Sequence, residues 1–306
     1  MTKRRPATDI GASVRQRLYN NSRATKRPFQ EVLQYFAMER FLYRLARSKY
    51  ANRFVLKGAL MFTVWRAPTS RPTKDIDLLA CMDNRVESIV PIVRKICQLT
   101  VEPDGVVFDL ESVQGRVIKE DADYEGVRVT FQASLDKAAV RMQLDLGFND
   151  VVTPAPTITE YPTILEFSAP RLYGYSRETV IAEKFEAMVK LGRLNSRLKD
   201  FFDLWMLSRQ FDFDGPTLVS AVSRTFEQRG TAMEFPPVAL TPQFASDPIK
   251  RTQWRGFLTK SKLTTAPQDI QEVLQTLVVF LGPVAQAIQS GQAFAARWQA
   301  PGPWKS

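Results

Sequence analysis

Apolar residues recur at helical and strand-like spacings along the first hundred residues of the chain. Spacings of three and four residues predict helices over residues 10–18, 29–45 and 86–99, because that period keeps the apolar side chains on one side of a helix. Residues 54–65 are mostly apolar and indicate a buried helix or helical turn. A short apolar run at residues 76–80, after a loop that contains Pro and Ser, predicts a strand.

The rest of the chain divides into a strand-rich block and a helical block. Runs between residues 106 and 148 alternate partly between apolar and polar positions and predict a strand meander. Residues 151–165 contain three prolines and indicate a linker or an edge segment. Helices are predicted beyond it, over residues 176–191, 196–211 and 269–290. We therefore expect a mixed α/β domain at residues 1–165 and a helical domain at residues 166–306.

Composition limits the chemistry that the chain can perform. Its 306 residues include 42 Lys and Arg against 32 Asp and Glu, so the formal net charge is +10. Such an excess favours a polyanionic partner: nucleic acid, a nucleotide or an acidic protein. The absence of histidine excludes Ser-His-Asp and Cys-His catalysis and disfavours a Cys/His zinc site. The two cysteines, Cys81 and Cys97, fit a reducing compartment.

No segment of the sequence predicts membrane insertion. The basic start MTKRRPATDI is not followed by an apolar segment, so a cleaved secretory signal is not expected. The longest apolar candidate, VLQTLVVFLGPVAQAI, is interrupted by Gly282 and Pro283, and we expect no spanning helix there. A soluble, cytoplasmic protein with no membrane partner is the expectation, and the sequence leaves the oligomeric state open.

Two aspartates begin the predicted strand in the stretch RPTKDIDLLA. Alternation along a strand sends residues i and i+2 to one face, so Asp75 and Asp77 should point the same way and repel each other unless a cation lies between them. Mg²⁺ prefers oxygen ligands, and paired carboxylates with substrate phosphates suit phosphoryl or nucleotidyl transfer. The alternative is a turn or cap residue at Asp75 and a solvated Asp77.

The neighbourhood of the pair favours the first interpretation. Lys57-Gly58-Ala59 upstream is a turn of small residues whose backbone N–H groups could hold phosphate oxygens. Arg71 and Lys74 flank the pair and could neutralise it or contact phosphates.

A third carboxylate stands in the stretch RMQLDLGF. Asp145 shares a strand face with Gln143 and Gly147, opposite the apolar residues. It could bind a second metal or activate an attacking hydroxyl, or it could lie on the solvated face of an amphipathic strand.

Five blocks of sequence occur in an order found in a known family. They are RFVLKGALMF, RPTKDIDLL, MQLDLGFND, ETVIAEKFEAMVKLG and NSRLKDFFDL. With the basic helices SVRQRLYN and EVLQYFAMERFLYRLARS, they resemble the AbiEii/AbiGii family of nucleotidyltransferase-like toxins of type IV toxin–antitoxin systems. The resemblance covers about residues 10–210. It implies an α+β fold related to DNA polymerase β-like nucleotidyltransferases, with a mixed sheet, flanking helices and a C-terminal helical domain.

The resemblance also implies roles for single residues. Asp75 and Asp77 would hold catalytic Mg²⁺, and Lys57 with Gly58 would form the phosphate-binding turn. Related enzymes usually carry Gly-Ser in this turn, whereas here Ala59 follows the glycine. Backbone amides or Thr73 would then replace the serine hydroxyl.

In the helical half, the resemblance implies that Lys184 meets the nucleotide phosphates and that Lys199 and Asp200 form the remaining motif pair, in a block ending at Asp203. Without the resemblance, spacing favours a solvated Glu183–Lys184 pair on an amphipathic helix. Asp200 and Asp203 share a face with Lys199 beside them, and could steer a cationic side chain, contact a ribose or be solvated. The expected metal ligands are Asp75, Asp77 and Asp145; the expected catalytic residues are these with Lys184 and Asp200; and the expected nucleotide-binding residues are Lys57, Gly58, Ala59, Arg71, Thr73, Lys184 and Lys199.

The leading hypothesis is a Mg²⁺-dependent nucleotidyltransferase toxin that moves a nucleoside monophosphate from an NTP to RNA, plausibly the 3′ end of tRNA, and so blocks translation. A second hypothesis makes the acceptor a small molecule, such as an aminoglycoside, or a protein hydroxyl. A third hypothesis is a binding module that binds RNA or an antitoxin without catalysis. The basic N-terminal run fits an RNA partner as well as an antitoxin-docking surface or a solvated helix face; it comprises Arg15, Arg17, Arg23, Lys26 and Arg27, with Tyr19 and Phe29 beside it.

Overall fold

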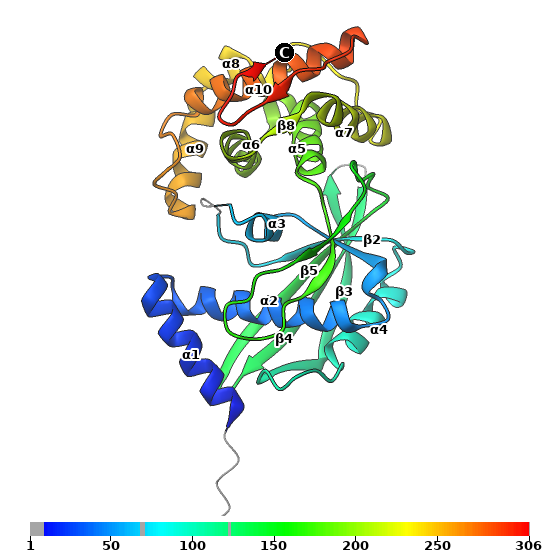
Figure 1. The fold of residues 1–306 in the computed structure, drawn as a ribbon, viewed down its shortest axis with the longest axis vertical. Coiled ribbons are helices and arrows are strands. Elements are labelled where there is room, and N and C mark those ends of the chain that lie inside the picture. Colours follow the sequence, from blue (N-terminus) through cyan, green and yellow to red (C-terminus); the bar gives the residue numbers. More distant parts are fainter. Residues whose placement is uncertain (1–8, 68–70, 122–123, 306) are drawn as a thin grey trace, which may run out of the picture. The chain divides into compact units, whose positions relative to one another are not determined.

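The structure is a computed structural model that describes residues 9–67, 71–121 and 124–305. The described chain forms two compact units (Figure 1). Unit 1 comprises Met1–Arg66, Pro72–Asn149 and Thr157–Gly174, and unit 2 comprises Ala67–Arg71, Asp150–Pro156 and Tyr175–Ser306. Each unit therefore contains more than one stretch of the chain.

Unit 1 is built on a mixed sheet of seven strands in the order β3-β4-β5-β2-β1-β7-β6. The neighbours β3, β4 and β5 form an antiparallel meander, as predicted, and β5 then pairs in parallel with β2. β2 is antiparallel to β1, β1 is parallel to β7, and β7 is antiparallel to the edge strand β6. The strands are β1 (Phe54–Lys57), β2 (Ile76–Ala80), β3 (Val106–Asp121), β4 (Tyr124–Leu135), β5 (Ala138–Phe148), β6 (Thr157–Glu160) and β7 (Arg171–Gly174).

Helices α2 (Phe29–Arg47) and α4 (Val86–Cys97) contact each other and the sheet, and α1 (Ile10–Thr25) lies against α2. Apolar residues of α2, among them Phe36, Phe41 and Leu42, are buried, which accounts for the wide apolar stripe of this helix. Polar contacts add to the packing, because Arg44 of α2 makes two hydrogen bonds, of 2.7 and 3.1 Å, to the carboxylate of buried Asp104. The predicted helices of this region are thus confirmed.

The prediction of a helix over residues 54–65 is wrong for its first part. These residues form strand β1, a turn at Gly58, and the short helix α3 (Leu60–Val64). Phe54–Lys57 is buried along its whole length, with β2 on one side and β7 on the other. A strand buried on both faces has no polar alternation, so its sequence cannot be distinguished from that of a buried helix.

Unit 2 is mainly helical, as expected for the end of the chain. Its helices are α5 (Arg177–Leu191), α6 (Leu198–Gln210), α7 (Gly215–Gln228), α8 (Pro242–Ser246), α9 (Pro248–Ser261) and α10 (Ile270–Ser290). Three two-residue strands, β8 (Phe213–Asp214), β9 (Arg297–Trp298) and β10 (Trp304–Lys305), form a small sheet of order β10-β9-β8. Trp254 and Trp298 are buried in this unit, and Trp298 donates a hydrogen bond to the Ser208 carbonyl.

The helix predicted over residues 269–290 is present as α10, and Gly282 and Pro283, which interrupt the apolar run in the sequence, do not break it. Burial of Phe280, Leu281 and Val284 in unit 2 stabilises the helix and offsets the hydrogen bond that a proline removes. In length and apolar composition α10 resembles a membrane-spanning helix, but 44% of its apolar window is buried inside the protein. The core helix of a soluble protein can have the same length and composition.

Candidate active site

Three adjacent strands of unit 1 bring the predicted site residues together. The register of β1 with β2 places Lys57 opposite Asp77, and the register of β2 with β5 places Asp77 opposite Asp145. Asp75 lies just before β2, two residues from Asp77. One carboxylate oxygen from each of the three aspartates lies within 4.8 Å of the other two. The expected convergence of the three carboxylates is therefore present in the structure.

Asp75 is held by the loop that precedes β2. The Thr73 hydroxyl donates a 2.6 Å hydrogen bond to Asp75 Oδ1, and the Lys74 backbone N–H donates to the same oxygen at 3.1 Å. The Thr73 backbone N–H in turn donates to the Tyr35 hydroxyl of α2. Thr73 therefore orients an aspartate of the triad, while the other Asp75 oxygen is left out of these bonds.

Gly58 permits the position of Asp77. Its φ is +69°, a left-handed conformation that glycine adopts without strain. A Cβ at this position would overlap Asp77 Oδ2. The next residue, Ala59, is buried and precedes α3. The small residues of the Lys57–Ala59 turn thus serve first to let the β1 backbone approach the carboxylate on β2.

Asp145 forms a bidentate ion pair with Arg128, which the sequence did not predict. Arg128 of β4 stands opposite it, and Arg128 Nε and Nη2 each donate to a different Asp145 oxygen at 2.7 Å. The Gln143 side-chain amide also donates to Asp145, at 3.1 and 3.3 Å. Only the register between neighbouring strands of the meander identifies Arg128 as the partner.

The charges of the triad act on Arg128. Its hydrogen bonds to Asp145 raise the pKa of Arg128; partial burial opposes the rise, and the charges of Asp145, Asp75 and Asp77 add to it. This guanidinium offsets one of the three negative charges, and buried Lys57, the register partner of Asp77, brings a second cation close to them. An excess of negative charge therefore remains on a compact set of oxygen atoms.

These residues fit a divalent cation. Carboxylate oxygens are the ligands that Mg²⁺ prefers, and three of them converge from two parallel strands and the adjoining loop. Asp75 and Asp77 are half-buried, which leaves room for water or phosphate ligands, whereas Asp145 is buried and fixed by Arg128. The donor set matches the chemistry expected from the sequence.

The predicted residues of the helical half form a separate cluster in unit 2. Lys184 Nζ of α5 lies 2.6 Å from Asp200 Oδ1 and 2.8 Å from Asp203 Oδ2 on α6. Asp203 also accepts two 3.2 Å hydrogen bonds from Arg71, and Asp200 accepts one of 2.7 Å from Arg197. Both aspartates are fully buried, so the alternative of solvated aspartates is wrong.

The pKa values in this cluster follow from the pairing. Burial alone would lower the pKa of Lys184, but attraction by Asp200 and Asp203 outweighs it and the pKa is raised. Burial alone would likewise raise the pKa of Asp200, but Lys184 and Arg197 lower it well below its usual range. Lys184 and Asp200 are therefore both charged across the neutral pH range, in an ion network that joins α5 to α6.

Lys199, predicted to bind nucleotide, lies on the exposed side of α6 and outside this network of hydrogen bonds. Arg197 was not predicted, because its role depends on how the turn before α6 directs it back to Asp200. The roles of Lys57, Arg71, Lys184 and Lys199 in nucleotide binding stay predictions.

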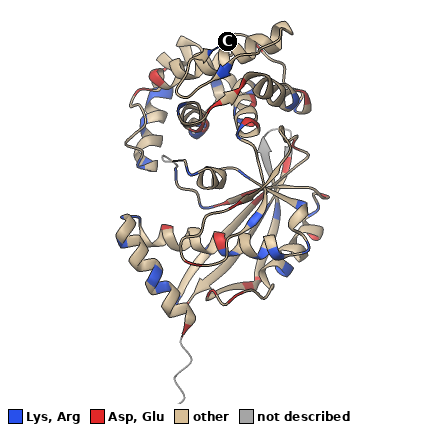
Figure 2. Ribbon diagram, viewed as in Figure 1, with Lys and Arg blue, Asp and Glu red and all other residues tan. Residues whose placement is uncertain are grey.

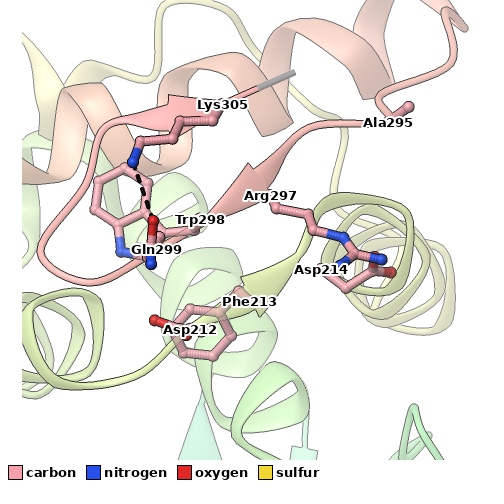
Figure 3. Close-up of a pocket in the computed structure, with 8 residues that line it drawn as sticks. All are labelled: Asp212, Phe213, Asp214, Ala295, Arg297, Trp298, Gln299 and Lys305. Atoms are coloured by element: carbon pink, nitrogen blue, oxygen red, sulfur yellow. Dashed lines mark hydrogen bonds between the residues drawn. The ribbon is translucent and has the colours of Figure 1, made fainter.

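Unit 2 also has a surface pocket of about 680 Å³ beside its small sheet (Figure 3). Its polar residues largely interact with one another and with nearby backbone or hydroxyl groups: Lys305 Nζ donates to Gln299, and Asp214 caps α7 through Thr217. Asp212 accepts a hydrogen bond from a neighbouring backbone N–H. None of the described residues that line it belongs to the predicted site, and we do not assign the reaction to this pocket.

Comparison with known proteins gives one family match. The family model described as nucleotidyl transferase AbiEii toxin, type IV TA system, matches residues 40–276. No curated protein matches the chain in a sequence search. Two solved structures match with a TM-score of 0.48 and 15% identity each: the crystal structure of JHP933 from Helicobacter pylori, covering 86% of this chain and 94% of that one, and that of a candidate nucleotidyltransferase from H. pylori, covering 87% and 99%.

Proposed function

The chain belongs to the family of AbiEii nucleotidyl transferase toxins of type IV toxin–antitoxin systems, and from this premise we propose that it transfers a nucleoside monophosphate from an NTP to RNA. The proposed acceptor is the 3′ end of tRNA, because loss of a usable 3′ end would stop translation. The observation that carries the proposal is the convergence of Asp75, Asp77 and Asp145 on one small volume. The family implies an antitoxin as a partner.

Asp75 and Asp77 would hold the catalytic Mg²⁺, with Asp145 beside them. When bound, this ion would neutralise the phosphate charge and polarise the phosphorus–oxygen bond that breaks. The Thr73 hydroxyl and the Lys74 N–H fix one oxygen of Asp75 and so set the direction of the other. The absence of a Cβ at Gly58 leaves space for the Asp77 carboxylate.

Asp145 is the proposed acceptor of the proton from the attacking RNA hydroxyl. In the balanced reaction, the hydroxyl oxygen forms a bond to the α-phosphorus, the bond from this phosphorus to the pyrophosphate oxygen breaks, and the hydroxyl proton passes to the carboxylate. Arg128 and Gln143 hold the Asp145 carboxylate in one orientation. Arg128 would also stabilise negative charge that develops nearby in the transition state.

In unit 2, the network of Lys184, Asp200 and Asp203 is proposed to fix the relative position of α5 and α6. Lys184 would contact NTP phosphates, as the family resemblance implies, only if it gave up part of its interaction with these aspartates. We propose that Lys199, on the exposed side of α6, supplies a cation to a bound polyanion.

The test is a transfer assay in which each of the four NTPs, labelled at the α-phosphate, is incubated with deacylated tRNA, total protein or aminoglycosides. Label is expected in the tRNA, only with Mg²⁺, and it should be lost in Asp77→Asn. Retention of label by protein or by an aminoglycoside instead would replace RNA by that acceptor. No transfer to any acceptor, with toxicity in cells undiminished in Asp77→Asn, would replace the enzyme by a binding module.

A further inference from the structure

Two segments of unit 2 are basic and contain no acidic residue. Residues 190–199 and 248–262 together contain nine Lys and Arg and no Asp or Glu. Figure 2 marks Lys and Arg positions along α9. The first segment spans the end of α5, the turn Gly192–Leu194 and the start of α6, and the second begins with α9. Arg197 of the first segment is paired with Asp200, whereas Arg193 and Lys199 are exposed. A stretch of this composition attracts a polyanion.

A buried lysine joins the two segments. Lys250 of α9 is 5% exposed, and its Nζ donates a 2.7 Å hydrogen bond to the backbone carbonyl of Asn195. Asn195 is fully buried, and its side chain accepts a hydrogen bond from the Arg197 backbone N–H. Burial of a charged ammonium group is unfavourable unless it is well paired, so this contact fixes the turn between α5 and α6 against α9.

The joined segments expose two aliphatic side chains. Leu194, which precedes Asn195, is 88% exposed, and Ile249, which precedes Lys250, is 64% exposed. They are the two most exposed large hydrophobic residues among the described residues of unit 2. Arg193 and Lys199 are exposed on the same segment as Leu194. Leu194, Ile249, Arg193 and Lys199 are called the basic patch below.

We propose that the basic patch binds the RNA acceptor, with Arg193 and Lys199 on its phosphates and Leu194 against an unstacked base. This proposal rests on the proposed function for the identity of the polyanion. Exposed cations on segments rich in Lys and Arg favour nucleic acid, and isolated Leu or Ile side chains are used as wedges between bases. A protein partner would require a larger contiguous apolar area than two separate side chains provide.

The test measures RNA binding without NTP and without Mg²⁺, so that it does not depend on catalysis. Fluorescence anisotropy of 5′-labelled deacylated tRNA is recorded for Arg193→Glu and for the control Arg209→Glu, which makes the same charge change at an exposed position elsewhere on α6. Arg193→Glu is expected to weaken binding at least tenfold and to reduce the salt dependence, because it removes a phosphate contact. Arg209→Glu is expected to bind within about twofold of the wild type.

A second pair tests the aliphatic contact. Leu194→Ser is expected to weaken binding about fivefold with the salt dependence unchanged, because this contact releases no counterions. Val279→Ser, an exposed apolar position on α10, is the control and should bind like the wild type. Circular dichroism melting of each variant checks that the fold is kept.

Equal affinities of Arg193→Glu and Arg209→Glu would overturn the proposal and would favour a protein partner for the patch. Weaker binding by Arg193→Glu, with no transfer by the wild type, would uphold the patch and refute the proposed function. Transfer to tRNA, with binding unchanged in Arg193→Glu, would uphold the proposed function and refute the basic patch as the RNA-binding surface.

Discussion

Replacing Lys184 by methionine would remove the central cation of the buried network in unit 2. The Lys184 ammonium group lies 2.6 Å from one Asp200 oxygen and 2.8 Å from one Asp203 oxygen, and both aspartates are fully buried. Methionine has a similar length and keeps most of the apolar contacts of the lysine side chain. The substitution therefore tests the charge rather than the volume.

The magnitude follows from what remains around the two carboxylates. Removing one partner of a buried ion pair typically costs about 3–5 kcal/mol. Here Asp200 keeps Arg197 and Asp203 keeps Arg71, so we expect the lower end, about 3 kcal/mol. At roughly 2–4 °C per kcal/mol, the melting temperature should fall by about 6–12 °C.

The pH dependence of this loss can be predicted from the pKa directions. The pKa of Asp200 is lowered, so its contribution to stability is present above the pKa of an unfolded aspartate and is lost only as the pH falls through the lowered value. The pKa of Lys184 is raised, so its contribution is present below the pKa of an unfolded lysine and is lost as the pH rises through the raised value. The destabilisation should therefore be the same at pH 6 and pH 9.

The assay is thermal and urea unfolding of the wild type, Lys184→Met and the control Lys199→Met, whose lysine is exposed on α6. Lys199→Met should unfold within about 0.5 kcal/mol of the wild type. If Lys184→Met unfolds like the wild type, the reasoning is refuted: the charge would then not stabilise the fold and would be available for substrate phosphates. Loss of transfer in Lys184 variants can be assigned to catalysis only in that case.

Two further substitutions test unit 1. Gly58→Ala should lose divalent-cation binding and should be less stable than the control Gly230→Ala. Both glycines have positive φ, but a Cβ at residue 58 would overlap Asp77, whereas nothing lies within 4 Å of a Cβ at residue 230. Titration with Mn²⁺ and thermal melting measure the two effects, and equal behaviour of the two variants would contradict the account. Arg128→Met should melt at a lower temperature without metal, because it removes two charge-assisted hydrogen bonds to Asp145. It should bind Mn²⁺ more tightly, because it also removes one positive charge beside the triad. An unchanged or weaker Mn²⁺ affinity would argue against a metal site there.

Local sequence rules predicted that Asp75 and Asp77 face the same way because their spacing is short-range geometry. Asp75 and Asp77 are two residues apart at the start of a strand, so alternation alone places them on one face. Asp145 was singled out as a third carboxylate on another strand, but its convergence on the pair depends on the parallel register of β2 with β5. Its partner Arg128 was missed, since their 17-residue separation becomes a contact only through the register of β4 with β5.

The other errors have similar causes. The buried strand β1 has no polar alternation, so the prediction of helix at its position had no local signal to oppose it. Arg197 was missed because its hydrogen bond to Asp200 depends on the turn that precedes α6. The family resemblance implied functional roles for Lys184 and Asp200, but only the packing of α5 on α6 shows that they bind each other.

The most direct test of the central claim is the affinity for Mn²⁺ in the presence of a non-hydrolysable NTP analogue, measured by electron paramagnetic resonance for the wild type, Asp77→Asn and Asp83→Asn. Asp83 is an exposed aspartate of unit 1 outside the triad, and its variant controls for the loss of one negative charge. We predict that Asp77→Asn weakens Mn²⁺ binding at least tenfold while Asp83→Asn binds like the wild type. Equal Mn²⁺ affinities of the wild type and Asp77→Asn would contradict the assignment of the triad as the metal site.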